Sequence, residues 1–82
     1  MSLADLRSVI YSDNTFKKNI AYSGTNAEYI GIALPGTADS SAGWQIRKVT
    51  YNGDNNPTDI DFANNSTKFD KSWDDRSSYS YG

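Results

Sequence analysis

The stretch from Gly43 to Gly53 places the strongest constraint on how this chain can fold. It reads Gly-Trp-Gln-Ile-Arg-Lys-Val-Thr-Tyr-Asn-Gly, and its aromatic and β-branched residues between glycines are typical of a β-strand. Trp44 and Ile46 share one face of such a strand, whereas the apolar residues beyond Arg47-Lys48 share the other. Either a bulge near Arg47-Lys48 brings all the apolar residues to one side, or the strand is covered on both faces. Both arrangements predict an inner strand.

Two further strands are predicted before this stretch. Residues 15–23 alternate between apolar and polar, with Lys18 in the apolar phase, which is typical of a half-buried edge strand. Gly24-Thr25-Asn26 breaks the pattern. Residues 27–34 then show the cleanest alternation in the chain, and Pro35-Gly36 ends it.

The two faces of residues 27–34 differ in side-chain size. One face carries the large aliphatic residues Ile30, Ile32 and Leu34, which we predict to be core residues. The other face carries Gly31 and Ala33, whose small size leaves room for a bulky side chain above them. Trp44 and Trp73 are the candidates for that place.

The chain continues with one strand and one ambiguous segment. Residues 52–57 predict a loop longer than a tight hairpin turn. Residues 58–63 alternate, with Ile60 and Phe62 expected inward and the aspartates outward. In residues 68–76, Phe69 and Trp73 fit both one helical turn and one face of a strand. Tyrosines 79 and 81 continue the same parity, so a strand is favoured.

Together these segments predict an all-β domain. Five to six short strands with frequent turns indicate a small antiparallel β-sandwich or open barrel over residues 15–82, as a single domain. A chain of 82 residues buries only about 60–65% of its unfolded surface, and there is no cysteine to cross-link it. The predicted core consists of Ile30, Ile32, Leu34, Trp44, Ile46, Ile60, Phe62, Phe69 and Trp73.

The first 14 residues predict an N-terminal arm or short helix. Leu3, Leu6 and Ile10 lie on one side at helical spacing, and residues 11–14 carry a turn signal. A helix of under three turns is marginal alone and needs a surface to dock on. We therefore predict interface positions at Leu3, Leu6 and Ile10, and also at Tyr79 and Tyr81, because tyrosine combines a large ring with a polar tip.

The composition restricts the possible chemistry. The chain has no histidine and no cysteine, which excludes a Ser-His-Asp triad and a thiol nucleophile within it. Asp59 and Asp61 have a spacing loosely compatible with a glycosidase pair. A solvated strand face explains them more simply, because neither has an apolar pocket to raise its pKa. We expect no catalytic residue and no cofactor.

A metal site is not expected either. Asp54, Asn56 and Thr58 stand at the alternate positions of a calcium-binding loop. Asp59 then occupies the position that needs glycine, and Asn65 the position of the bidentate glutamate.

Charge and hydropathy disfavour two classes of partner. The net charge of -2 gives no attraction for a phosphate backbone, so no nucleic acid is expected. The longest apolar window, residues 29–34, is far too short to cross a bilayer, so no membrane is expected.

Three segments in this order resemble a known set of proteins. They are Tyr29-Ile-Gly-Ile-Ala-Leu-Pro-Gly-Thr37, Gly43-Trp-Gln-Ile-Arg-Lys-Val49 and Phe69-Asp-Lys-Ser-Trp-Asp-Asp-Arg76 with Tyr79 beyond. The pattern is similar to small proteins encoded among the structural genes of tailed bacteriophages, over roughly residues 20–82. The resemblance implies a virion protein assembled in the host cytoplasm, in contact with other virion proteins and present in many copies or as a homo-oligomer. It implies no catalytic residues.

The leading hypothesis is therefore a non-enzymatic virion component of the capsid surface, neck or tail that acts by packing. The alternative is a glycan-binding module of a phage tail or fibre, with exposed aromatic rings as stacking platforms. Exposed tryptophans would favour the glycan-binding module, and buried tryptophans would favour packing. A glycosidase built on Asp59 and Asp61 is the weakest hypothesis.

Overall fold

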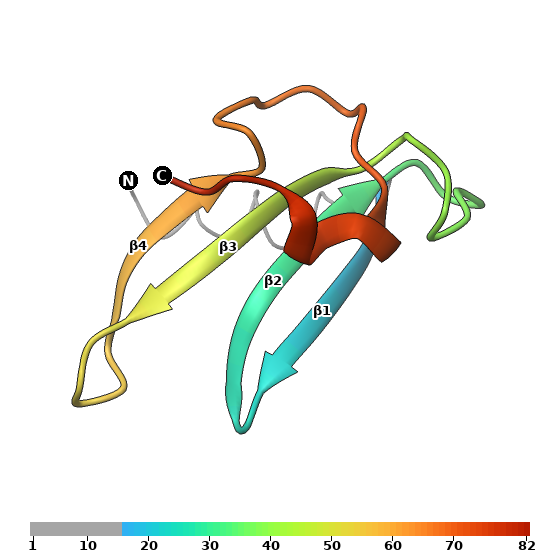
Figure 1. Cartoon of the computed structure of the whole chain (residues 1–82). Helices are drawn as coiled ribbons and strands as arrows, with labels where there is room; N and C mark the ends of the chain where they lie inside the picture. Colours follow the sequence, from blue (N-terminus) through green and yellow to red (C-terminus); the bar gives the residue numbers. More distant parts are fainter. Residues whose placement is uncertain (1–15) are drawn as a thin grey trace, which may run out of the picture.

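A computed structural model describes residues 16–82, which form a four-stranded antiparallel sheet in the order β1-β2-β3-β4 (Figure 1). The elements are β1 (Lys17–Ser23), β2 (Asn26–Ala33), β3 (Gln45–Tyr51), β4 (Pro57–Phe62) and the 3-10 helix η2 (Trp73–Ser78). The all-β class is confirmed. The prediction of five to six strands in a sandwich or barrel is wrong for the described residues, where four strands form one open sheet.

Local chemistry sets the two hairpins. Gly24 turns β1 into β2 with a φ of 62°, a backbone conformation that glycine adopts without steric cost. Between β3 and β4, the Oδ1 atom of Asn52 accepts the backbone N–H groups of Asp54 and Asn56, at 2.9 and 3.1 Å. Asn55 in this loop has a φ of 61°. The loop is thus longer than a tight turn, as the sequence predicted.

The central strand β3 pairs with β2 on one side and β4 on the other, so its prediction as an inner strand is confirmed. The ladder with β4 is irregular between Thr50 and Tyr51, not near Arg47-Lys48. The first of the two predicted arrangements is therefore wrong. Ile46 and Val49 are both buried although they lie on opposite faces, so the strand is apolar on both sides.

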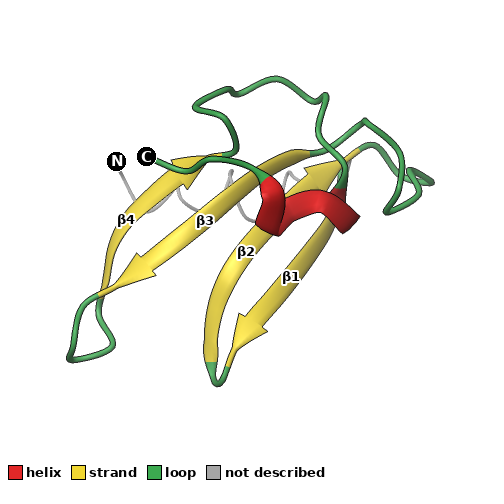
Figure 2. Cartoon of the chain, in the orientation of Figure 1, coloured by secondary structure: helices red, strands yellow, loops and turns green. Residues whose placement is uncertain are grey.

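The C-terminal segment crosses one face of the sheet, and η2 lies within it (Figures 1 and 2). Trp44 and Lys71 exchange two backbone hydrogen bonds of 2.9 and 3.0 Å. Beyond η2, Tyr81 forms a bridge with Ala63. The segment is thus attached to the sheet at two separate points.

The prediction of a strand across residues 68–76 is wrong, because only isolated bridges flank a helical turn. In η2, two aspartates stand in the first turn and Arg76 in the last, which suits the helix dipole. The N–H of Asp74 donates to the Asp39 carbonyl at 3.1 Å, and the Ser78 hydroxyl donates to the Asp75 carbonyl at 2.6 Å. One long-range bond and one local bond thus replace a strand ladder.

The core lies between the sheet and the C-terminal segment. It consists of Ala33, Trp44, Ile46, Ala63 and Trp73, with Ala21, Tyr29, Tyr79 and Tyr81 packed against it. A Cβ atom added to Gly31 would lie 2.6 Å from Cε3 of Trp73 and 3.0 Å from Cε3 of Trp44. Both tryptophans therefore occupy the room predicted above Gly31, and the core positions of Trp44, Ile46 and Trp73 are confirmed.

The other predicted core residues face away from this cluster. Leu34, Ile60 and Phe69 are exposed, so their prediction as core is wrong, and Ile30, Ile32 and Phe62 are only half-buried. The reason is strict alternation: because Gly31 points at the tryptophans, its neighbours in β2 point the other way. The same alternation places Asp61 on the core side of β4, opposite Lys48, and not on the outward side as predicted.

Candidate functional site

The surface of the sheet that faces away from the core is the main candidate site, and we call it the open face. Its apolar residues are Ile20, Ile30, Ile32, Val49, Ile60 and Phe62, of which Val49 is buried and Ile30, Ile32 and Phe62 are half-buried. Ile20 is 48% exposed and Ile60 59% exposed. Apolar side chains that protrude together from one surface mark a place for contact with other apolar groups.

Strand register brings these side chains together. Ile20 of β1 lies directly opposite Ile30 of β2, and Val49 of β3 lies opposite Ile60 of β4. Directly opposite residues in an antiparallel pair have Cβ atoms about 5 Å apart. Between these two pairs, Arg47 of β3 lies opposite Ile30 and Gln45 lies opposite Ile32. All four strands contribute to the open face, and two polar side chains separate its apolar residues.

Three polar side chains on the open face are Lys18, which lies opposite Ile32, and Gln45 and Arg47, which bond within the described part of the chain. The guanidinium of Arg47 donates to Oε1 of Gln45 at 2.8 Å and lies over the ring of Phe62, 5.2 Å from its centroid. The amide of Gln45 donates to the Thr67 carbonyl at 2.7 Å. No buried side-chain nitrogen or oxygen in residues 16–82 lacks a partner. The face thus offers apolar contact more than polar recognition.

An apolar pocket lies at the β1 entry to the sheet. It has a volume of about 320 Å³ and is lined by Phe16, Leu34, Thr37, Gly43 and Phe69. The rings of Phe16 and Phe69 stack with centroids 5.8 Å apart. By alternation, Phe16 and Leu34 share the parity of Ile20 and Ile32, so the pocket extends the apolar character of the open face to the point where residue 15 joins.

A second pocket marks a split between β2 and β3. Their ladder ends at the pair Tyr29–Lys48, and beyond it the strands separate around a space of about 360 Å³. The hydroxyl of Tyr51 donates across the split to the Ala27 carbonyl at 2.7 Å. Glu28 and Lys48 both line the space, so charges of both signs are present and no single ligand chemistry is favoured.

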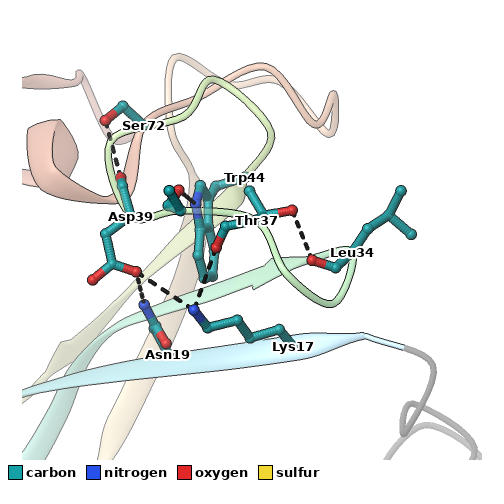
Figure 3. A network of polar contacts seen from close by, with 8 residues as sticks. Lys17, Asn19, Leu34, Thr37, Asp39, Trp44 and Ser72 are labelled. Atoms are coloured by element: carbon teal, nitrogen blue, oxygen red, sulfur yellow. Dashed lines mark hydrogen bonds and ion pairs between the residues drawn. The ribbon is translucent and has the colours of Figure 1, made fainter.

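A polar network holds the loop between β2 and β3 against the core (Figure 3). The carboxylate of Asp39 accepts the amide of Asn19 at 2.9 Å and lies 3.8 Å from the ammonium of Lys17. The Asp39 carbonyl accepts the hydroxyl of Ser72 at 3.2 Å, and the indole N–H of Trp44 donates to the Ala38 carbonyl at 2.9 Å. This cluster joins β1, the loop and the C-terminal segment, so its role is structural.

Another ion pair lies beside the C-terminal segment. The buried Lys71 ammonium contacts the Asp70 carboxylate. The hydrogen bond from Lys71 holds the pKa of Asp70 below its usual value. This pair also accounts for the burial of a lysine, since a buried charge needs a partner.

The carboxylate pair and the partial calcium loop considered from the sequence lie away from the two pockets. Asp59 is exposed and Asp61 half-buried, and neither lines a pocket described above. Within residues 16–82, no three acidic, histidine or cysteine side chains gather closely enough to hold a metal ion. In the loop that partly matches a calcium site, the side chain of Asn52 is bonded to the backbone.

The predicted aromatic and interface residues fall in two groups. Leu3, Leu6 and Ile10 lie outside the described residues. Tyr79 and Tyr81 are half-buried and pack on the chain's own core, and their role at a partner interface stays a prediction. The hydroxyl of Tyr79 accepts the N–H of Ser72 at 2.8 Å, and that of Tyr81 donates to the Arg76 carbonyl at 2.7 Å.

The environment of Tyr81 alters its acidity. Burial raises the pKa of Tyr81 to about 12, with a further contribution from Tyr29 and Tyr79 nearby. The ring of Tyr81 lies 5.7 Å from that of Tyr29. This tyrosine therefore stays neutral and packed at physiological pH.

Sequence reasoning missed the open face, although its signal was present. Ile30 and Ile32 alternate with the small residues Gly31 and Ala33. Either the small-residue face packs against a tryptophan in the core, or the aliphatic face forms the core. Two buried tryptophans on the small-residue side imply that the aliphatic side is the outer one.

No protein-family model, curated protein or solved structure matches this chain. Within residues 16–82, no helix has the length and apolar character needed to span a membrane.

Proposed function

We propose that this chain is a non-enzymatic structural subunit that acts by packing against other proteins in many copies, as a component of a tailed-phage virion. The observation that carries the proposal is the open face, an apolar surface on the side of the sheet opposite the core. Its exposed members include Ile20 and Ile60. A surface of this kind gains about 25 cal/mol per Å² of apolar area when it is covered.

Two further observations support packing over the glycan-binding alternative. Trp44 and Trp73 are buried, so neither presents a ring on which a sugar could stack. Tyr79 and Tyr81 are engaged by the chain's own core. The virion setting rests on the sequence resemblance to phage structural proteins, and the open face supplies a physical means of assembly.

The proposal is tested in particles of a phage that encodes this chain. Purified virions are analysed by mass spectrometry after production with the natural chain, with Ile60→Asp or with Thr25→Asp. Ile60 lies on the open face, whereas Thr25 is exposed in the β1–β2 turn. We expect the natural chain and Thr25→Asp in the particles, and at least a tenfold loss of Ile60→Asp, because a buried charge without a partner is costly.

Two results would contradict the proposal. Absence of the natural chain from virions would overturn the structural role itself. Equal incorporation of both aspartate variants would remove the open face as the contact surface. Circular dichroism of the isolated variants checks that both remain folded.

A further inference from the structure

We infer that, in the isolated protein, residues 2–10 of the same chain cover the open face, so that a partner must displace them to reach it. The inference concerns the free subunit and extends the proposed function only by naming what occupies the face before assembly. It rests on the apolar character of the open face, on the point where the chain enters the sheet, and on the sequence of the segment outside the described residues.

The chain enters the sheet beside the surface that needs covering. Residue 15 joins at Phe16, and Phe16 lines the apolar pocket together with Leu34 and Phe69. The strand that follows is β1, whose Ile20 lies on the open face opposite Ile30. A segment that leaves Phe16 and turns back thus meets the pocket first and the isoleucines next.

The length of the segment suits the surface. Residues 2–10 as a helix would be about 14 Å long. The outer strands of a four-stranded sheet lie about 14 Å apart, at roughly 4.8 Å per step. Residues 11–15 can span up to about 17 Å when extended, and their turn signal favours a reversal of direction. The segment can therefore reach across all four strands.

The chemistry of the two surfaces also matches. Leu3, Leu6 and Ile10 recur on one side at helical spacing, and the open face presents Ile20 and Ile60 with half of each side chain in contact with solvent. A helix of this length needs a docking surface to be stable. Contact with other apolar groups would remove the open face from water, which is favourable.

Docking within one chain is favoured over docking on another copy. A short connector gives the tethered segment an effective concentration on the order of millimolar. Copies of the free protein in solution at micromolar concentration compete poorly with it. The open face would therefore be shielded in the free subunit and become available to a partner only after displacement of residues 2–10.

The experiment uses the absence of native cysteine. A nitroxide attached to Ser8→Cys in the full-length chain broadens nuclear magnetic resonance signals of nearby groups. We expect at least fivefold stronger relaxation enhancement at the methyl groups of Ile20 and Ile60 than at the indole N–H of Trp73, which packs on the opposite side of the sheet. Equal or weaker enhancement at the isoleucines would overturn the inference.

A mixed sample separates the two possible occupants. Spin-labelled chains without isotope are combined with isotope-labelled chains that carry no nitroxide. The inference expects no enhancement at Ile20 or Ile60 in this sample. Enhancement there would show that another copy supplies the segment, and it would overturn docking within one chain while leaving the virion test of the proposed function unaffected.

A matched pair of variants provides a second readout. In Leu6→Asp the new charge falls on the apolar side of residues 2–10, and in Ser8→Asp it falls on a polar position. We expect Leu6→Asp to raise the fluorescence of the apolar dye ANS at least threefold, and Ser8→Asp to leave it unchanged. Equal dye fluorescence of Leu6→Asp and the natural chain would contradict the inference. Because residues 16–82 hold the core cluster, circular dichroism of the sheet is the folding control.

Discussion

At the scale of single residues, Gly31 determines which side of the sheet becomes the core. The absence of a side chain there lets Trp73 and Trp44 approach β2 closely. Both indoles are buried, and their centroids lie 5.8 Å apart. Because a close approach to the backbone is possible only on this side of β2, the aliphatic residues of the strand are left on the other.

We expect Gly31→Ala to destabilise the fold by about 1–3 kcal/mol, as is usual when atoms are added to a filled core. The added Cβ would lie 2.6 Å from the Trp73 ring, so the indole or the strand must move. Urea unfolding followed by tryptophan fluorescence measures the change. Gly53→Ala is the matched control, because a Cβ there meets nothing within 4 Å; equal free energies of unfolding for the two variants would contradict the argument.

At the scale of elements, the C-terminal segment replaces the second sheet that a sandwich would supply. It is attached to the sheet at Trp44 and at Ala63. Between these points, η2 places Arg76 over Trp73, with its guanidinium carbon 4.7 Å from the ring centroid. Aromatic rings and the guanidinium of Arg76 thus cover a face that another set of strands would otherwise cover.

The attachment at Tyr81 predicts a dependence of stability on alkaline pH. Because the pKa of Tyr81 is raised to about 12 from a usual value of 10, the native state holds its proton more tightly than the unfolded state. Its contribution to stability is complete below pH 10 and is lost as the pH rises from 10 through 12. The difference in urea midpoint between the natural chain and Tyr81→Phe should therefore shrink from pH 9 to pH 11.

Tyr81→Phe also removes the hydrogen bond to the Arg76 carbonyl, which contributes about 0.5–1.5 kcal/mol at pH 9. Tyr22→Phe serves as the control, because the Tyr22 ring is largely exposed. A difference between the natural chain and Tyr81→Phe that stays constant or widens with pH would count against the assignment.

At the scale of the whole molecule, one open sheet with a small core is expected to have a low free energy of unfolding. Among residues 16–82, the buried hydrophobic cluster contains five residues, and Tyr79 and Tyr81 are two of the four partly buried residues packed against it. Small domains bury a low fraction of their surface. Stability must therefore depend on the C-terminal tyrosines as well as on the strands.

We expect deletion of residues 79–82 to abolish cooperative unfolding. It removes the ring of Tyr81 against Tyr29 and the hydroxyl of Tyr79 that accepts the Ser72 N–H. Near-ultraviolet circular dichroism and the steepness of the urea transition are the measurements. Deletion of Gly82 alone is the control, and a sharp transition in the longer deletion would refute the dependence.

Local sequence patterns were sufficient to predict most of the strands. Alternation defined β1, β2 and β4 within one or two residues, and glycine and asparagine marked the hairpins. The same alternation predicted that β3 is an inner strand and that a tryptophan fits above Gly31. These features are local because backbone geometry and side-chain size act over a few neighbouring positions.

The face of the sheet that the core occupies could not be predicted from local patterns. Alternation divides residues such as Ile30 and Gly31 between two faces, but it does not say which face another segment will cover. The indoles of Trp44 and Trp73 pack over the small residues of β2, so the core lies on that face and Ile60 is exposed on the other. For η2, the spacing of Phe69 and Trp73 suited strand and helix equally, and the long-range bond from Asp74 to Asp39 accompanies the helical turn. Contacts between distant parts of the chain, which no local pattern encodes, thus placed the core on one side and the candidate site on the other.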